Sequence, residues 1–145
     1  MGFQFSLATV LRVRGILEEQ EERMLQKILF EMAQTRETLA STESALEALD
    51  AARHRDVYKP VIGRNIHASY GELVEHKQNR VNLEEKLEKL GQLRDQQLKI
   101  YEKAHRNREM LTEMRHEKRS AYETDISRLE QKTLDDIFIS RRGRK

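Results

Sequence analysis

Two Glu-x-x-His motifs are the clearest candidates for chemistry in this sequence of 145 residues. They are Glu102–His105 and Glu113–His116. On a helix, residues i and i+3 share one face, and such pairs on separate helices bind di-iron centres in carboxylate proteins. Here both motifs fall on one predicted helix, about 16 Å apart along its axis, so they cannot face each other. Because the sequence is rich in Glu, we interpret the motifs as chance spacing and expect no metal site.

Other catalytic and cofactor motifs are absent from the sequence. It has no GxxxxGK[ST] phosphate loop, no GxGxxG dinucleotide motif and no GxSxG nucleophile motif. The five histidines include no i,i+4 pair suited to zinc, and the absence of cysteine removes disulfides and thiolate ligands. A chain of two long helices also offers no concave pocket for a reaction. We therefore expect no catalytic residues, no cofactor and no enzymatic activity.

Composition favours a thin structure over an ordinary globular domain. Charged residues make up 36% and hydrophobic residues 37% of the chain, against roughly 25% and 45–50% in typical domains. Such a chain can supply a narrow seam between two helices, although it cannot fill a thick core. The 27 basic and 25 acidic residues are intermixed, which favours solvated helix faces over disorder or a basic stripe for nucleic acid. The basic tail RRGRK is the exception.

The elements that position these residues are two long helices separated by one break. The stretch Arg55–Gly71 contains the only proline, Pro60, which disfavours helical backbone at Lys59. Ser69 and Glu72 have the spacing of a capping box. The sequence thus predicts one all-α domain, residues 1–145, in which two long helices form an antiparallel coiled-coil hairpin and the second helix is longer. The expected bounds are about 6–56 for the first helix, 57–69 for the turn, 70–138 for the second helix and 139–145 for the basic tail.

A heptad seam is the main evidence for the first helix. Its residues are spaced alternately by three and four positions, which predicts one buried face; they are Leu25, Ile28, Met32, Thr35, Leu39, Thr42, Leu46 and Leu49. Upstream, Val10, Leu17 and Met24 are also seven apart but one position out of phase. This offset predicts a stutter near Met24. The opposite face, which includes the run EEQEER, is expected to be solvated.

The second helix has an apolar seam that turns polar beyond Gly91. It is expected to open with Tyr70, Val74 and Val81 and to continue through Leu83, Leu87 and Leu90; the seam positions after these are Arg94, Gln97, Tyr101, Ala104, Arg108, Leu111, Arg115, Tyr122 and Leu129. We expect this polar stretch to be loose or partly unpaired. Near the end, an apolar stripe of Tyr122, Ile126, Leu129 and Ile137 is expected to meet the N-terminal residues Leu7, Val10 and Leu11.

Both ends of the sequence resemble the bacterial flagellar export protein FliJ family. The opening Phe3–Arg14 is similar to that family's F-x-F-x-L-x-x-V-L-x-x-R pattern. The stretch Glu130–Asp136, followed by basic residues, is similar to its E-Q-K-x-L-D-E ending, with Asp136 where the family usually has glutamate. Gly63, Ile66 and Tyr70 also fit the middle of the family's pattern.

The resemblance implies a non-catalytic component of the flagellar type III protein export apparatus. Members of this family are coiled-coil shafts that insert into the hexameric export ATPase and stimulate it. They also contact the cytosolic domain of the membrane export gate and escort substrate chaperones. The implied location is the cytoplasm, peripheral at the inner membrane through the export apparatus, with no direct lipid insertion and no nucleic-acid partner. The alternative is a generic coiled-coil adaptor or tether.

The resemblance and the predicted arrangement together suggest two contact regions. The ATPase-binding region is expected at the open end, where the second helix should project several turns past the N-terminus; its residues are Leu7, Leu11, Arg14, Lys132, Leu134, Asp135, Arg141 and Arg142. The export-gate region is expected at the hinge end; its residues are Tyr58, Tyr70, Leu73 and Val74. The family's gate contact is rich in aromatic residues, whereas this sequence offers Leu73, Val74 and Lys77.

Overall fold

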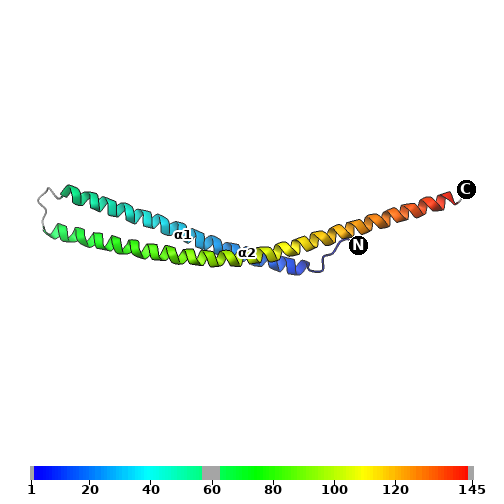
Figure 1. Cartoon of the computed structure of the whole chain (residues 1–145), viewed down its shortest axis with the longest axis horizontal. Helices are drawn as coiled ribbons and strands as arrows, with labels where there is room; N and C mark the ends of the chain where they lie inside the picture. Colours follow the sequence, from blue (N-terminus) through cyan, green and yellow to red (C-terminus); the bar gives the residue numbers. More distant parts are fainter. Residues whose placement is uncertain (1, 57–62, 144–145) are drawn as a thin grey trace. The chain divides into compact units, whose positions relative to one another are not determined.

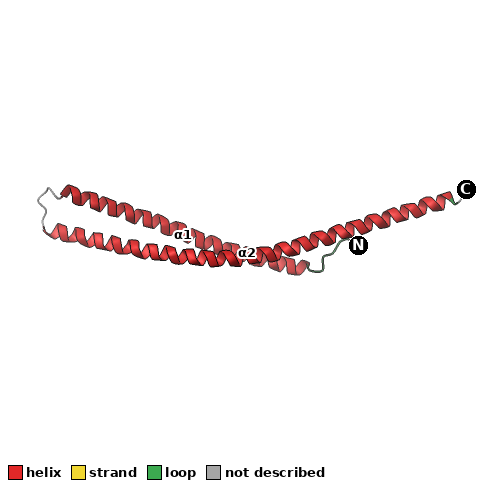
Figure 2. Ribbon diagram, in the orientation of Figure 1, coloured by secondary structure: helices red, strands yellow, loops and turns green. Residues whose placement is uncertain are grey.

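The chain is all-α and consists of two helices, the second longer than the first. A computed structural model describes residues 2–56 and 63–143. Helix α1 is Ala8–Asp56, with 49 residues, and helix α2 is Gly63–Arg142, with 80 residues. The described residues contain no strand (Figure 2). The two helices pack against each other, which confirms the predicted two-helix hairpin with a longer second helix.

Contacts divide the chain into two units, each containing a segment of both helices. The terminal unit comprises Met1–Glu21 and Tyr101–Lys145, and the central unit comprises Glu22–Ile100. In the central unit, α1 and α2 lie side by side (Figure 1). Each unit has its own narrow line of buried residues, as expected for a chain with few apolar side chains.

The antiparallel direction is visible in the contacts of the terminal unit. Phe3 packs against Tyr122, Phe5 lies under Lys118, and Glu18 bonds to Arg108. As the residue number rises on one side, it falls on the other. The two segments of this unit therefore run in opposite directions.

The heptad seam of α1 is confirmed in the central unit. All eight predicted seam residues are buried or half-buried, and Met32 and Thr35 are each only 3% exposed. The hydroxyls of Thr35 and Thr42 donate to the carbonyl oxygens four residues earlier, Glu31 at 2.7 Å and Thr38 at 3.0 Å. These bonds satisfy the polar atoms, which explains how threonine is tolerated in a helix seam.

The predicted stutter near Met24 is wrong. Val10, Leu17 and Met24 are all exposed, whereas Glu18 is buried and Glu21 half-buried. Glu18 and Glu21 continue the three–four spacing of the Leu25 seam without interruption. The prediction that the whole EEQEER run is solvated is therefore also wrong, because its first residue, Glu18, faces α2.

The seam of α2 agrees with the prediction over most of its length. Every predicted position from Leu83 to Leu111 is buried or half-buried, including Leu90 and Gln97. From Arg94 to Leu111 the polar stretch is thus packed and not loose, whereas Arg115 and Leu129 further along are exposed. The expected opening is wrong: Tyr70, Val74 and Val81 are exposed and Leu73 is buried in their place.

The bounds of α2 differ from the prediction at both ends. The helix begins at Gly63 and not near Tyr70, so Ser69 lies inside it and cannot be an N-terminal cap. Nothing in the residues after Pro60 prevents a helix, because glycine weakens a helix without ending it. At the other end the helix continues through Ser140 and Arg141, where a basic tail was expected, and Gly143 N donates to Ile139 O at 3.0 Å. The predicted turn residues 57–62 lie outside the described residues.

Candidate partner-binding end

The N-terminal segment before α1 packs on the later part of α2. The Phe3 and Tyr122 ring centroids are 5.6 Å apart, and the Phe5 side chain is buried. The Lys118 ammonium lies 5.9 Å from the centre of the Phe5 ring, within range of a cation–π contact. Ala8 N then donates to Phe5 O at 3.1 Å as the chain enters the helix. Phe3 and Phe5, which belong to the opening motif of the sequence, therefore pack the N-terminal segment onto α2.

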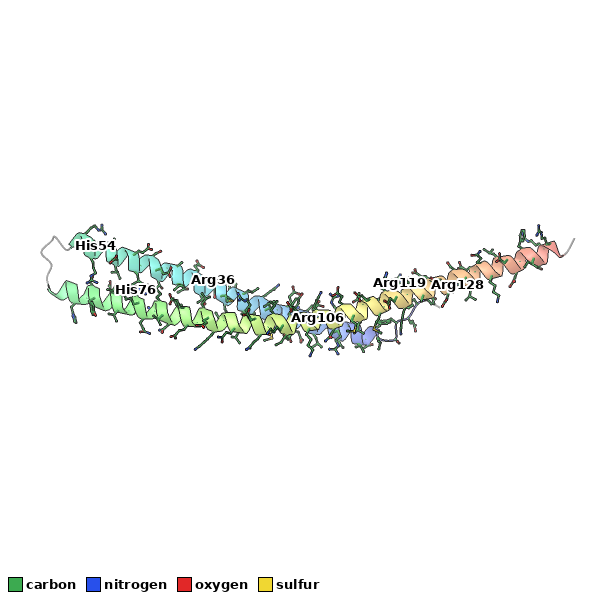
Figure 3. All side chains as sticks on the ribbon, in the orientation of Figure 1. Arg36, His54, His76, Arg106, Arg119 and Arg128 are labelled. Carbon is green, nitrogen blue, oxygen red and sulfur yellow. The ribbon has the colours of Figure 1, made fainter. Side chains whose placement is uncertain are left out.

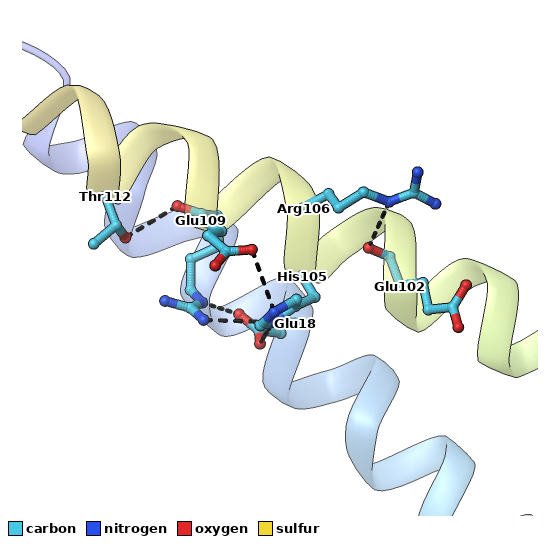
Figure 4. Close-up of polar contacts among 7 residues, drawn as sticks. Glu18, Glu102, His105, Arg106, Glu109 and Thr112 are labelled. Carbon is cyan, nitrogen blue, oxygen red and sulfur yellow. Dashed lines mark hydrogen bonds and ion pairs between the residues drawn. The ribbon is translucent and has the colours of Figure 1, made fainter.

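A polar cluster occupies the seam further along the same unit (Figure 4). The Glu18 side chain, 12% exposed, comes from α1. His105 Nδ1 lies 2.8 Å from Glu18 Oε1, and Arg108 Nε donates to Glu18 Oε2. On the other side of the ring, His105 Nε2 is 3.5 Å from Glu109 Oε2. Because a carboxylate only accepts, the short contact to Glu18 requires a proton on Nδ1 of His105.

The charges of this cluster support one another. Burial raises the pKa of Glu18, but the hydrogen bonds from Arg108 and His105 outweigh it, so that the pKa lies below the ordinary value. The bond to Glu18 raises the pKa of Arg108. Glu18 is therefore an ionised carboxylate in a helix seam, which is tolerated because two donors compensate its lost hydration.

The two residues of the Glu102–His105 motif do not point at a common site. Figure 4 shows the Glu102 carboxylate directed away from His105, whose ring nitrogens face Glu18 and Glu109. The backbone oxygen of Glu102 accepts from Arg106 Nε at 3.4 Å. Among the described residues, no group of three or more His, Asp or Glu side chains is arranged to hold a metal ion. His105 instead joins the two helices.

The last part of α2 presents its side chains to solvent. Every described residue from Ser127 to Gly143 is exposed, including Leu129, Leu134, Phe138 and Ile139. The Arg142 guanidinium lies 5.4 Å from the centre of the Phe138 ring. Figure 3 labels Arg128 within this stretch and Arg119 before it on α2, and both residues are exposed. This exposed apolar surface is therefore a candidate site for a partner.

The expected contact between the apolar C-terminal stripe and the N-terminus occurs only in part. Tyr122 meets Phe3 and Ile126 is half-buried, but Leu129 and Ile137 are exposed. The stripe is thus covered at Tyr122 and partly at Ile126, and it is open at Leu129 and Ile137.

The predicted ATPase-binding residues lie in two groups within the terminal unit. Leu7 and Leu11 are half-buried, Leu11 lines a shallow groove with Phe5 and Arg115, and Arg14 is exposed. The second group is exposed further along α2; it comprises Lys132, Leu134, Asp135, Arg141 and Arg142. Leu7 and Leu11 thus contribute to packing, whereas Arg14 and the second group are accessible.

The predicted gate residues also divide by exposure. Tyr70 and Val74 are exposed on α2, but Leu73 is buried in the packing of the central unit and is not available to a partner. Tyr58 lies outside the described residues. Neither described helix contains a stretch long and apolar enough to cross a membrane.

No protein-family model, curated protein or solved structure matches this chain.

Proposed function

We propose that this chain is a non-catalytic component of the flagellar type III protein export apparatus. In this role it is a coiled-coil shaft whose last α2 residues bind and stimulate a hexameric export ATPase. The proposal includes contact with the cytosolic domain of the export gate and escort of substrate chaperones. It places the chain in the cytoplasm, at the inner membrane through its partners.

The observation that carries the proposal is the exposed end of α2. The stretch Glu130–Asp136, which resembles the ending of FliJ-family sequences, falls where all described side chains are exposed. Leu134 is 66% exposed there, and Lys132 and Asp135 flank it with opposite charges. A surface with an apolar anchor between charges is suited to a protein partner, since the anchor supplies affinity and the charges fix the orientation.

The second support is the way in which the rest of the terminal unit is held together. Phe5 is buried and the Glu18 cluster joins α1 to α2. Phe5 contacts Lys118 and Glu18 contacts Arg108, and both of these α2 residues precede Ile126. The exposed end of α2 therefore continues from a part of the helix that is packed. A helix anchored in this way can present its side chains to a partner without refolding, which lowers the entropic cost of binding.

The test is the ATPase rate of the cognate hexamer with the intact chain and with residues 130–145 removed. The intact chain is expected to raise the rate, and the truncated chain to lose most of this effect. The packed part of the terminal unit lies outside the deletion, so the truncated chain should keep its helical circular dichroism. An unchanged rate with the truncated chain would rule out the ATPase contact at this end.

The gate contact is proposed at the exposed residues near the start of α2. Because Leu73 is buried, the informative variant is Tyr70→Ala combined with Val74→Ala. It is expected to weaken binding to the cytosolic gate domain while ATPase stimulation stays intact. Loss of both activities would show that the substitutions had unfolded the helices instead.

A further inference from the structure

Four residues on the exposed end of α2 share one face of the helix. They are Glu130, Leu134, Ile137 and Arg141, spaced by four, three and four positions. At 3.6 residues per turn, their directions fall within an arc of about 60°. We call this surface the 130–141 face.

The 130–141 face is open along its length. Leu134 is 66% exposed and Ile137 46% exposed. Shallow grooves run beside them, one lined by Glu130 and Leu134 and the next by Ile137 and Arg141. Neither Glu130 nor Arg141 forms an ion pair with another residue that the structure describes. The face thus has two apolar side chains between two charged ones, and neither charged side chain has an ion-pair partner among the described residues.

The order of these residues makes the face complementary to itself. It reads acid, apolar, apolar, base, with the same spacing from either end. When a second copy is reversed, its Arg141 lies opposite Glu130 and its Ile137 lies opposite Leu134. Each contact occurs twice, as a two-fold interface requires. A parallel pairing would instead place Glu130 against Glu130 and Arg141 against Arg141, which is repulsive.

We propose that the 130–141 face pairs antiparallel with the same face of a second copy of this chain. The two apolar layers, Leu134 with Ile137 of the second copy and the reverse, lie at the centre. The two Glu130–Arg141 pairs close the ends. This is the arrangement of a short antiparallel coiled coil, in which charges flanking the seam select the partner and its direction.

The proposal goes beyond the proposed function, since it concerns the chain alone. The same end of α2 is the proposed ATPase contact, so a second copy and the ATPase would compete for it. The two properties are independent: a chain that stays monomeric can still stimulate the ATPase, and a chain that dimerises can lack ATPase stimulation. Measurements on the purified chain alone therefore test the pairing separately.

The first experiment is sedimentation velocity of the full chain over a range of concentrations. A dimer that grows with concentration is expected. Glu130→Arg and Arg141→Glu should each weaken it about tenfold, since each converts two attractive pairs into two repulsive ones. The variant carrying both substitutions should regain the dimer, because the pairs are restored with the signs exchanged.

A matched control is available on the far side of the helix. Lys132→Glu makes the same change in net charge as Arg141→Glu, but Lys132 points about 170° away from the centre of the face. This variant should dimerise like the unchanged chain. A chain that stays monomeric throughout, or a dimer that ignores both single reversals, overturns the proposal.

The direction of pairing is tested by disulfide trapping, since the chain has no cysteine. In an antiparallel pair, Glu130→Cys in one copy lies opposite Arg141→Cys in the other. The two positions in one copy are about 16 Å apart along the helix, too far for like positions to be bridged. A disulfide is expected only when the two variants are mixed. Linkage of Glu130→Cys with itself, or no linkage in the mixture, overturns the antiparallel register.

Discussion

Replacing Glu18 by alanine tests how the terminal unit is held together. The Glu18 carboxylate lies in the seam, with a side chain 12% exposed, and accepts from Arg108 Nε and from His105 Nδ1 at 2.8 Å. Alanine removes both bonds and leaves Arg108 and His105 without their acceptor on α1. We expect this variant to be the most destabilising polar substitution in the unit.

The magnitude follows from the exposure of the donors. Breaking a fully buried ion pair costs about 3–5 kcal/mol. Here the Arg108 and His105 side chains are 33% and 40% exposed, so water replaces part of what they lose and screens the charges. We therefore expect the free energy of unfolding to fall by about 1–2 kcal/mol at neutral pH. Glu18→Leu should cost less than Glu18→Ala, because it fills the seam with an apolar layer.

The pH dependence of this effect has a definite sign. The pKa of Glu18 in the folded chain lies below its ordinary value near 4.5. Such a group stabilises the fold fully above its unfolded-state pKa, and the contribution is lost as the pH falls through the folded-state pKa. The difference between the unchanged chain and Glu18→Ala should therefore be largest at neutral pH and shrink as the pH falls below about 4.5.

The assay is urea unfolding followed by circular dichroism, since urea leaves ion pairs unscreened. Glu19→Ala is the matched control, because Glu19 is the exposed neighbour of Glu18 and its loss should change stability by less than about 0.5 kcal/mol. If Glu18→Ala and Glu19→Ala unfold at the same urea concentration at neutral pH, the cluster does not join the helices as we describe.

Three further substitutions test the packing by urea unfolding. Gly71→Ala should raise the free energy of unfolding by about 1 kcal/mol, because Gly71 lies inside α2 and an added Cβ meets nothing within 4 Å; a decrease would place Gly71 outside a helix. Met32→Ala should cost about 2 kcal/mol and Leu29→Ala under 0.5 kcal/mol, since only Met32 is buried; equal losses would contradict the seam. Phe5→Ala should cost about 2 kcal/mol and expose the N-terminal segment to protease, whereas Phe30→Ala, at an exposed position, should do neither.

The sequence was sufficient to predict the parts of the fold that depend on apolar periodicity. Leu25, Met32 and Leu46 recur at heptad spacing, and this pattern has one physical meaning on a helix, a buried face. The break near Pro60 separated the two helices. The longer second helix followed from the distance between that break and the last apolar residues.

Polar residues in the seam were harder to predict. Glu18 sits at the correct heptad position, but a search for apolar side chains passes over a carboxylate and finds Leu17 instead. The missed signal was the phase: counting back from Leu25 by four and three reaches Glu21 and Glu18. Partners for Glu18 come from α2, and their positions depend on the register between helices, which the spacing along one helix does not contain.

The exposure of the last part of α2 was also hard to predict, because it too depends on the register between the helices. Leu129 and Ile137 have the spacing of a buried stripe, so the sequence predicted that the N-terminal residues would cover them. Whether a stripe is covered depends on which segment packs on it: Phe3 packs on Tyr122, whereas Leu129 and Ile137 are exposed. Ile137, which belongs to the face proposed for pairing, is thus a residue that periodicity alone would have assigned to the core.

The most direct test of the account is to identify what the intact chain binds in its own cells. The tagged chain should be captured alongside the version lacking residues 130–145, and the bound proteins identified by mass spectrometry. The account predicts that the hexameric export ATPase is recovered with the intact chain and is strongly reduced with the truncated one. Recovery of scaffold proteins with no export component would contradict the export assignment and favour a generic coiled-coil adaptor.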